Sequence, residues 1–526
     1  MAFARVYSAQ TFLLKGQVVT VEIDTFRGLN AFSIVGLPDK AVDEARDRVG
    51  SALKNSGFTS PKSINQKTII SLAPAEIKKE GSFFDLAIAL GYLLCIGEMK
   101  FNPEKKLFLG ELALNGELKS VRGVLPLTQM AKDTGFEEIY LPEENAHEAA
   151  LIEGIKVFGV KNLVEVIRHL NIKKSRPSDR HGADQKLGQK QELFKITQKP
   201  RTEINYETSN PPLDFSDIKG QEGAKRGLEI AAAGGHNVAM SGPPGTGKTM
   251  LARAFSYLLP ALDRDEIFEI TGIHSIAGIL NRELVTTAPF RSPHHTSSYV
   301  SVIGGGTFPK PGEVTLAHRG VLFLDEFPEF EKRVIESLRQ PLEDRVVNIS
   351  RSKGTARFPA QFILIAAMNP CPCGYAGSKQ KDCVCRPVDL DRYRRKISGP
   401  IIDRVDIWLR VENVDYEKLS SKNKSGETTE NISGRVKKAR AIQKERFAGL
   451  SKKIKTNSEM TVKDIDILPI KDEVKKILND SAEKLNLSAR AYHRVIKLAR
   501  TIADLDSSED IKTPHILEAL QYRPRS

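Results

Sequence analysis

Long apolar runs and cysteine are both scarce in this sequence of 526 residues. No apolar run approaches the roughly 18 residues that a membrane-spanning helix needs, so no membrane partner is expected. The first residues, MAFARVYSAQTFLLKGQ, lack an apolar core followed by a small-residue cleavage site, which argues against a secretory signal. The chain is therefore expected to be cytoplasmic. Thiols stay reduced there, so a cluster of cysteines indicates a metal more often than disulfide bonds.

Positive charge is present in excess. Lysine and arginine total 79 against 66 acidic residues, which gives a formal net charge of +13. Such an excess favours a polyanionic partner, either nucleic acid or anionic lipid. The chain is also too long for one compact core, because domains usually span ~100 to 200 residues, and its length predicts three or four domains.

The sequence changes character at three places. Residues 1–170 alternate β-rich runs, such as VVTVEID and KTIISLA, with helical patterns, such as AVDEARDRVGSALKNSG and HEAALIEG, which predicts an α/β domain. Residues 171–212 are rich in Lys, Gln and Pro and indicate an exposed linker. A second α/β domain is predicted over 213–411. Helical patterns fill 412–526 after a polar tract near residue 420.

A phosphate-binding loop (P-loop) follows the strand-like run NVAM and precedes the helical run MLARAFSYLL. Glycines let backbone N–H groups approach phosphates, Lys248 contacts the β and γ oxygens, and the Thr249 hydroxyl binds Mg²⁺. The alternative is an ordinary glycine turn before a helix, which the full GxxxxGKT spacing disfavours. The predicted ligands of ATP and Mg²⁺ here are Gly242, Pro243, Pro244, Gly245, Thr246, Gly247, Lys248 and Thr249.

Two later apolar runs end in polar residues. The run VLFL leads into Asp325 and Glu326, which is typical of a buried strand ending in two acids. In a P-loop enzyme, Asp325 would hold the Mg²⁺ shell and Glu326 would orient and deprotonate the attacking water. The run FILIAAM leads into Asn369, which could reach the γ-phosphate or that water. The alternative for Asn369 is a turn residue at a strand end before Pro370.

Four of the five cysteines lie within the fifteen-residue stretch CPCGYAGSKQKDCVC. Two Cys-x-Cys pairs can supply four thiolates to a tetrahedral Zn²⁺ and so fold a loop too short and polar to have its own core. The spacing departs from the commoner Cys-x-x-Cys, and an iron-sulfur cluster or a redox-sensitive thiol pair remains open. The predicted ligands of a structural Zn²⁺ are Cys371, Cys373, Cys383 and Cys385.

The strings GEVTLAHRGVLFLDEFPEF, AAMNPCPCG, ISGPIIDRVDI and SARAYHRVIKLARTIADL resemble the ComM/YifB family of magnesium-chelatase-like AAA+ ATPases. The resemblance covers nearly the whole chain apart from the linker and the polar tract. It implies an N-terminal Lon-protease-like α/β domain, a P-loop AAA+ α/β core with a helix-2 insert and a presensor hairpin, and a C-terminal helical lid. It also implies a homo-hexameric motor acting on single-stranded and branched DNA, a helicase that promotes branch migration during natural transformation.

By position, the resemblance assigns roles to two arginines. Arg404, in IIDRVD, matches the finger arginine that is presented to a neighbouring subunit's ATP, where a cation stabilises charge developing on the phosphoryl group. Arg490, in SARAYHR, matches the lid arginine that senses the γ-phosphate. In the first domain, Phe83 and Leu125 stand where Lon has its serine and lysine, so this domain lacks the dyad and is expected to be a scaffold or a DNA-binding platform.

The stretch between the P-loop and the acidic pair is far longer than the roughly 30 residues of a minimal strand-helix-strand unit. The resemblance assigns APFRSPHHTSSYVSVIGGG to the insert and VVNISRSKGTARF to the hairpin, both at a central pore. Arg351, Lys353 and Arg357 are the DNA-binding residues expected there, and a solvated charged loop is the alternative. His294 and His295 lack a cysteine or carboxylate at ligand spacing, which favours a structural or subunit-contact role.

Two other functions remain open. One is a metal-chelatase-type ATPase chaperone subunit, against which stand the Lon-like domain and the cysteine loop, since neither is expected in that subunit. The other is an ATP-dependent protease, against which stand Phe83 and Leu125 at the dyad positions.

Overall fold

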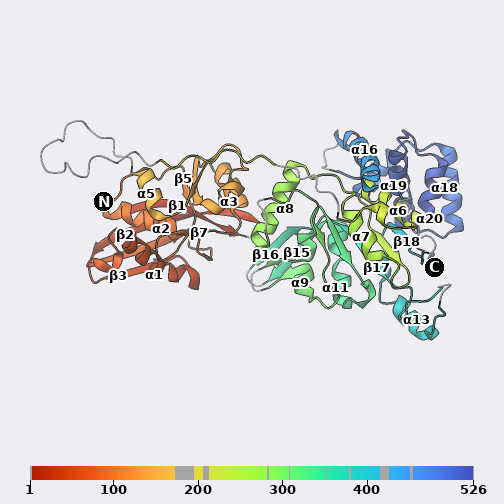
Figure 1. The fold of residues 1–526 in the computed structure, drawn as a ribbon, viewed down its shortest axis with the longest axis horizontal. Helices are drawn as coiled ribbons and strands as arrows, with labels where there is room; N and C mark the ends of the chain where they lie inside the picture. Colours follow the sequence, from red (N-terminus) through yellow and green to blue (C-terminus); the bar gives the residue numbers. More distant parts are fainter. Residues whose placement is uncertain are drawn as a thin grey trace. The chain divides into compact units, whose positions relative to one another are not determined.

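The computed structural model describes residues 3–12, 14–171, 195–204, 212–280, 284–306, 309–351, 354–377, 381–414, 426–449 and 454–524. The chain divides into two compact units (Figure 1). Unit 1 comprises Met1–Asn205 and Thr271–Leu284, and unit 2 comprises Tyr206–Ile270 and Val285–Ser526. Both units mix helices with sheets, which confirms the predicted α/β class.

Unit 1 is built on a seven-stranded sheet with the order β3-β4-β2-β1-β5-β8-β9. The long strands β1, β2 and β4 pair antiparallel, and the remaining neighbours pair parallel. The runs VVTVEID and KTIISLA lie in β2 and β4, as predicted. The strands are β1 (Phe3–Phe12), β2 (Lys15–Arg27), β3 (Ala31–Val35), β4 (Gln66–Ala73), β5 (Lys106–Phe108), β8 (Glu138–Pro142) and β9 (Lys156–Val160), with a ribbon of β6 (Glu111–Leu112) and β7 (Leu118–Lys119).

The main helices of unit 1 begin and pack for local reasons. Helix α1 (Lys40–Asn55) starts at Asp39, whose carboxylate accepts the N–H of Val42. Helix α2 (Asp85–Ile96) is almost wholly apolar and buried. A side chain at Gly91 would place its Cβ 2.2 Å from Ile23 Cδ1, so glycine is needed where α2 packs on β2. The other helices are α3 (Val124–Asp133), α4 (Ala146–Ala149) and α5 (Leu163–Leu170), and α4 is shorter than the helical pattern HEAALIEG predicted.

Part of the stretch expected as a linker packs on unit 1. The N–H of Lys199 donates to the carbonyl of Val157 in β9, and the N–H of Thr202 donates to that of Ala150. Residues 195–204 are therefore held along one edge of the unit. The rest of the expected linker, except residues 171 and 212, lies outside the described residues.

Unit 2 contains a five-stranded sheet in the order β11-β14-β17-β10-β18. All five strands run parallel, so their carboxyl ends share one edge, and the side chains that follow the central strands meet there. The apolar runs predicted as strands are β10, β14 and β17, and β14 and β17 are buried along their whole length. The strands are β10 (Val238–Ser241), β11 (Phe290–Arg291), β14 (Val321–Leu324), β17 (Ile363–Met368) and β18 (Ile407–Arg410).

The predicted insert begins later than expected. Phe290 and Arg291 form β11 of the core sheet and pair with β14, so they are not part of an insert. The segment that follows contains α9 (Tyr299–Ile303), a ribbon of β12 (Gly304–Gly305) with β13 (Lys310–Pro311), and α10 (Glu313–Leu316). The predicted hairpin is present as β15 (Val346–Arg351) paired antiparallel with β16 (Gly354–Pro359).

Helices surround the sheet of unit 2, and the C-terminal helices belong to the same compact unit. Figure 1 shows α6, α16, α18, α19 and α20 gathered together, and their apolar faces join one core with β10 and β18. The predicted core and C-terminal helical segments thus lie in one compact unit. The helices are α6 (Glu222–Gly234), α7 (Lys248–Ser256), α8 (Arg264–Ala277, of which unit 2 includes the start), α11 (Lys332–Ser337), α12 (Arg339–Asp344), α13 (Pro387–Arg394), α14 (Gly399–Ile402), α16 (Thr429–Phe447), α17 (Val462–Asp466), α18 (Asp472–Lys484), α19 (Ala489–Leu505) and α20 (Thr513–Gln521).

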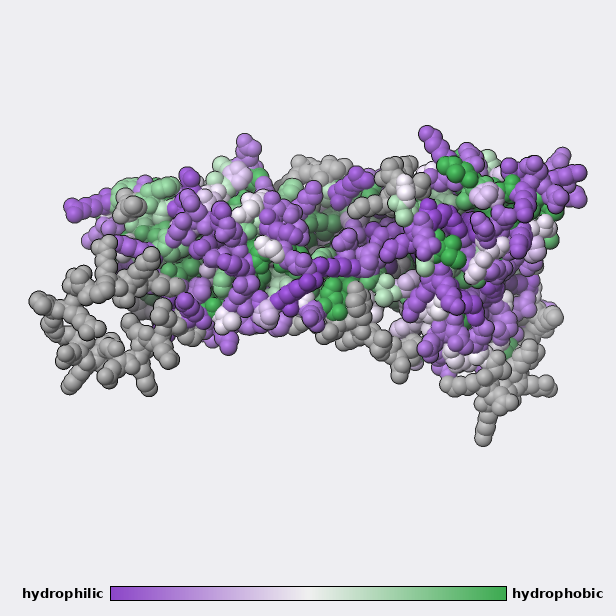
Figure 2. Space-filling view, turned by 90° about the horizontal axis from the view of Figure 1, so that it is seen from above, coloured by the Kyte–Doolittle hydropathy of each residue, from purple (hydrophilic) through white to green (hydrophobic). Residues whose placement is uncertain are grey.

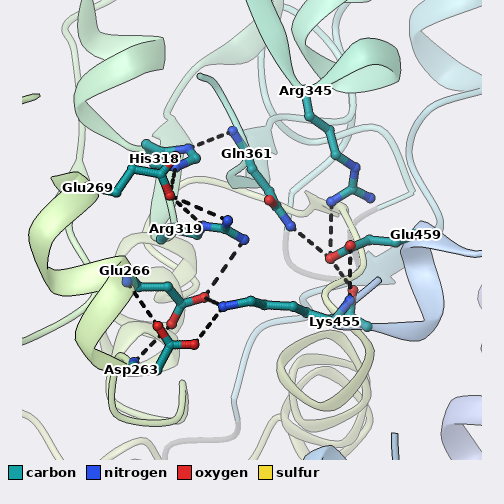
Figure 3. A network of polar contacts seen from close by, with 10 residues as sticks. Asp263, Glu266, Glu269, His318, Arg319, Arg345, Gln361, Lys455 and Glu459 are labelled. Carbon is teal, nitrogen blue, oxygen red and sulfur yellow. Dashed lines mark hydrogen bonds and ion pairs between the residues drawn. The ribbon is translucent and has the colours of Figure 1, made fainter. Parts of the chain in front are cut away.

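A polar network joins the C-terminal helical part of unit 2 to its core (Figure 3). Lys455 Nζ lies 2.6 Å from Asp263 Oδ2 and 2.7 Å from Glu266 Oε1, at the start of α8. Its backbone N–H donates to Glu459 over 3.1 Å. Arg319, two residues before β14, lies 3.7 Å from the same Glu266 carboxylate. The network continues through Glu269, His318, Arg345 and Gln361.

The outer surface is mainly polar. Figure 2 shows hydrophilic residues over most of the visible face, with small hydrophobic patches between them. Among the described residues, no helix is both long and apolar enough to cross a membrane.

Candidate nucleotide and metal site

The P-loop lies between β10 and α7 and depends on its glycines. Gly245 and Gly247 have φ of 78° and 87°, in the left-handed region that favours glycine. A Cβ at Gly242 would lie 2.0 Å from the carbonyl oxygen of Val411, so that position has no room for a side chain. Helix α7 begins at Lys248. The N-terminus of a helix attracts anions, because its first N–H groups have no partner within the helix.

Lys248 is buried at the centre of this loop. Its Nζ donates to the carbonyls of Gly242 and Pro243, each over 2.8 Å, and to Oδ1 of Asn369 over 3.3 Å. Burial lowers the pKa of Lys248, while the carboxylate of Asp325 raises it. The hydrogen-bond acceptors of the Lys248 ammonium group are thus neutral, and phosphate oxygens can replace them. Asn369, which follows β17, lies beside this group.

The two acids follow β14 and differ in their contacts. Asp325 Oδ2 accepts the hydroxyl of Thr249 over 3.0 Å, so the two predicted Mg²⁺ ligands are already together. Glu326 has φ of 50°, unusual for a residue other than glycine, and its N–H donates to Asp325 Oδ1 over 2.9 Å. This turn separates the two carboxylates, since Asp325 faces the P-loop threonine and the Glu326 side chain is exposed.

A histidine that the sequence did not connect with catalysis touches the predicted base. His295 Nδ1 lies 3.1 Å from Oε2 of Glu326. The His295 ring also packs against His294, with centroids 4.2 Å apart, and edge-on to Phe330. The sequence predicted a structural or subunit-contact role for His295. The structure adds that its ring lies within ion-pair distance of one oxygen of the Glu326 carboxylate.

The two arginines taken from the family resemblance lie away from these contacts. Arg404 pairs with Glu343 of α12, and its Nη1 donates to the carbonyl of Pro400 over 2.6 Å. Arg490 stands in the first turn of α19, exposed, and its side chain has no hydrogen bond or ion pair among the described residues. The chain by itself brings neither arginine to the P-loop through a direct contact.

The four clustered cysteines come together after Asn369. The Cys371 Sγ lies 3.3 Å from that of Cys373 and 3.7 Å from that of Cys383, and the sulfurs of Cys373 and Cys383 are 3.5 Å apart. With Cys385, all four sulfurs lie within 4.8 Å of one another. Sulfurs at ~2.3 Å from a tetrahedral Zn²⁺ would be about 3.8 Å apart, so the spacing fits this metal.

Backbone N–H groups donate to the sulfurs of Cys371 and Cys373. The N–H of Ala376 donates to the Cys371 sulfur over 3.2 Å. The N–H of Tyr375 is the main cause that lowers the pKa of Cys373 to about 6. Metal-bound cysteine is a thiolate, so both contacts suit a ligand. Cys95, the fifth cysteine, is buried in unit 1 as predicted.

The hairpin exposes part of the predicted DNA grip. Arg357 stands on β16 opposite Asn348 and its side chain is exposed. Arg351 ends β15, opposite Gly354, but its side chain and all of Lys353 lie outside the described residues.

In unit 1, Phe83 and Leu125 are the apolar residues that the resemblance to Lon assigns to the dyad positions. Leu125 is buried in α3, and Phe83 packs its ring against Gly81. The neighbouring Ser82 donates its hydroxyl to Glu111, and the buried Lys79 donates to the carbonyl of Pro74. These two side chains thus have partners other than each other.

Comparison with known proteins identifies the family. The chain is 40% identical over 527 residues to the Competence protein ComM of Haemophilus influenzae, covering 99% of this chain and 98% of that protein. It belongs to the ComM/YifB family of magnesium-chelatase-like proteins. Escherichia coli YifB, another member, is 38% identical, with 99% of this chain and 97% of that protein covered.

The ComM/YifB chain also matches three family descriptions. Residues 21–145 match "Subunit ChlI of Mg-chelatase", residues 214–419 match "Magnesium chelatase, subunit ChlI", and residues 426–523 match "Magnesium chelatase, subunit ChlI C-terminal". The magnesium-chelatase 38 kDa subunit of Rhodobacter capsulatus is 27% identical over 39% of this chain and 60% of that protein. Magnesium-chelatase-like AAA+ proteins are ATPases, and the family therefore implies ATP and Mg²⁺ as ligands.

The second of these matches contains the P-loop, the acidic pair, Asn369 and the cysteine cluster. His295 also lies within it, and the sequence could have suggested it only as one of two adjacent histidines in the expected insert. The sequence could not give the distance between His295 and Glu326, because 30 residues and three strands separate them in the chain.

Proposed function

We propose that this ComM/YifB-family chain is a cytoplasmic, Mg²⁺-dependent ATPase that works as a homo-hexameric DNA helicase and drives branch migration on recombination intermediates. The proposed ATPase activity is supported by Lys248, Thr249 and Asp325, which lie together at one edge of the sheet. The full-length similarity to a protein named for competence supports the DNA part. The excess positive charge fits a nucleic-acid partner.

In this proposal each residue of the nucleotide site has one task. Mg²⁺ supplies positive charge to the transferred phosphoryl group when ATP is bound. Lys248 exchanges the carbonyls of Gly242 and Pro243 for phosphate oxygens, and Thr249 and Asp325 hold the metal shell. Glu326 takes a proton from the attacking water, and the oxygen of that water becomes part of the phosphate product. Asn369 orients that water or the γ-phosphate.

The finger role of Arg404 requires a second subunit. Within one chain Arg404 pairs with Glu343, and a guanidinium presented to a neighbour's ATP must leave that partner. Arg490, exposed at the first turn of α19, is proposed to sense the γ-phosphate when the lid closes. Both tasks fit hydrolysis that depends on assembly.

Phosphate contacts through the hairpin are proposed for DNA binding. Arg357 is exposed on β16, and Arg351 and Lys353 stand at or beside the tip of the same hairpin in the sequence. Contacts of this kind do not depend on base sequence, which suits a motor that moves along any DNA.

A structural Zn²⁺ is proposed for Cys371, Cys373, Cys383 and Cys385. The sulfur spacing supports it, and so does the lack of a core in the loop. About one Zn²⁺ per chain is expected by metal analysis of the purified protein, whereas an iron-sulfur cluster would show iron and visible absorbance.

The experiment that tests the proposal measures ATP hydrolysis with and without DNA. Single-stranded or branched DNA should raise the rate, and the protein should move the branch point of a synthetic four-way junction only when ATP is present. A chelatase-type chaperone subunit would hydrolyse ATP at a rate indifferent to DNA, and this result would overturn the DNA part. ATP-dependent cleavage of an unfolded protein would instead favour the protease alternative.

A further inference from the structure

The cysteine loop touches the P-loop. Gly374, in the segment CPCG, has φ of 85°. A Cβ at this position would lie 2.8 Å from Cδ and 3.3 Å from Cγ of Pro244 in the P-loop, and 4.0 Å from Cγ of Asn369. Glycine is therefore needed here for two reasons, the left-handed backbone and the close approach to Pro244.

Pro244 stands among the groups that shape the phosphate site. The carbonyl of its neighbour Pro243 accepts from both Lys248 Nζ, over 2.8 Å, and Thr246 Oγ1, over 2.9 Å. Asn369, which accepts from the same ammonium group, comes two residues before Cys371. The cysteine loop is thus attached to the nucleotide site at Asn369 and packs against it at Pro244.

The loop has little to hold this position without a metal. Among residues 371–377 and 381–385, only Cys371 and Gly374 are buried, so almost no apolar surface is removed from water. Its inner contacts are few, with the N–H of Gly374 donating to the carbonyl of Cys371 over 3.0 Å. One outer contact joins Arg410 of β18 to the carbonyl of Gly377 over 3.1 Å.

We infer that the metal-bound cysteine loop is a wall of the nucleotide site, and that metal occupancy sets the affinity for ATP by fixing Gly374 against Pro244 and holding Asn369 beside Lys248. The inference rests on the proposed ATP and Zn²⁺ sites. The four thiolates supply the bonds that a polar loop of this length cannot obtain from packing. Loss of the metal would release the loop from Pro244 and remove the acceptor Asn369 from Lys248.

Two matched glycine variants distinguish the effect of the contact with Pro244 from the effect of backbone strain at a positive φ. Gly374→Ala places a methyl group against the Pro244 ring but leaves all four cysteines in place. Gly377→Ala introduces the same kind of backbone strain in the same loop, since its φ is 72°. Its Cβ would meet Arg410 Nη2 at 3.5 Å, an ordinary contact, and would not approach the P-loop.

The measurement is the dissociation constant of a fluorescent ATP analogue, with bound zinc and the melting temperature determined on the same samples. Gly374→Ala should keep about one zinc per chain and weaken nucleotide binding by roughly tenfold, as expected for the loss of one charge-assisted hydrogen bond. Gly377→Ala should change binding less than about threefold. Removing zinc from the parent protein with a chelator should weaken binding as much as Gly374→Ala or more, and added Zn²⁺ should restore it.

Three results would overturn the inference. Parent-like nucleotide binding by folded Gly374→Ala would mean that the contact with Pro244 is incidental. Equal losses in the two glycine variants would assign the effect to backbone strain. Unchanged binding after complete zinc removal would separate the metal from the nucleotide site. A parent protein that binds no ATP analogue at all would instead refute the proposed ATPase function, so the two failures are distinguishable.

Discussion

The contact between His295 and Glu326 predicts how one side chain contributes to ATP turnover. Nδ1 of His295 lies 3.1 Å from Oε2 of the Glu326 carboxylate. One carboxylate oxygen bound in this way leaves Oε1 to accept the proton of the attacking water. His295→Ala should therefore lower kcat and leave KM for ATP nearly unchanged, because the P-loop contacts of Lys248 and Thr249 remain.

The size of the effect follows from the exposure of the pair. A solvent-exposed ion pair contributes about 0.2 to 1 kcal/mol, which corresponds to roughly 1.4- to 5-fold in rate. The side chains of His295 and Glu326 are 30% and 53% exposed, so water competes for both partners. We therefore expect a loss of at most about fivefold in kcat.

Steady-state ATP hydrolysis by the full-length protein, over a range of ATP concentrations, separates kcat from KM. His295→Asn keeps a donor near the position of Nδ1 and should recover most of the rate. His294→Ala is the matched control, because His294 hydrogen-bonds to Thr296 over 2.8 Å rather than to the acid. A parent-like kcat in His295→Ala, or an equal loss in His294→Ala, would refute the positioning role.

Three further predictions concern the other tasks. Glu326→Gln should bind ATP like the parent and lose nearly all turnover, because it lacks a base, and rapid hydrolysis by this variant would place the base elsewhere. Arg404→Ala and Lys248→Ala should each be inactive alone but regain part of the activity when mixed, since intact arginine and lysine then meet at mixed interfaces; inactivity of the mixture would contradict action between subunits. Arg357→Ala should keep basal ATPase activity but bind single-stranded DNA more weakly, with a log-log salt slope shallower by roughly 0.7 per lost contact, and Lys310→Ala should change the slope less. An unchanged slope for Arg357→Ala would remove it from the DNA contacts.

The parts of the site that could be predicted from the sequence are those in which local residues carry the chemistry. The P-loop glycines and Lys248 are fixed by their spacing, and a buried run that ends in Asp325 predicts a strand whose end reaches the same sheet edge. The four cysteines likewise indicate a metal from proximity in the sequence alone. Their sulfurs do come together in the structure.

What could not be predicted depends on distances between segments remote in the chain. Nothing local to Gly374 reveals that Pro244 lies against it, and the histidine pair gives no sign of Glu326. The dipeptide at 290–291 is too short to indicate a strand without its partner β14, so it was expected to belong to the insert. The segment HEAALIEG has a helical pattern, yet the helix ends at Ala149 and residues 150–155 form turns and bends that lead into β9.

The polar network around Lys455 affects how salt-dependent measurements on this protein are interpreted. Lys455 and Asp263 are partly exposed, with 35% and 54% of their side chains accessible, so dissolved ions screen their attraction. Raising the ionic strength thus weakens the ion pairs between Lys455 and the start of α8 even when no polynucleotide is present. Arg319 shares Glu266 with this lysine and lies two residues before β14, so the strand that precedes Asp325 is sensitive to the same screening. A salt titration of ATP hydrolysis without DNA provides the baseline to subtract before any loss at high salt is attributed to phosphate contacts.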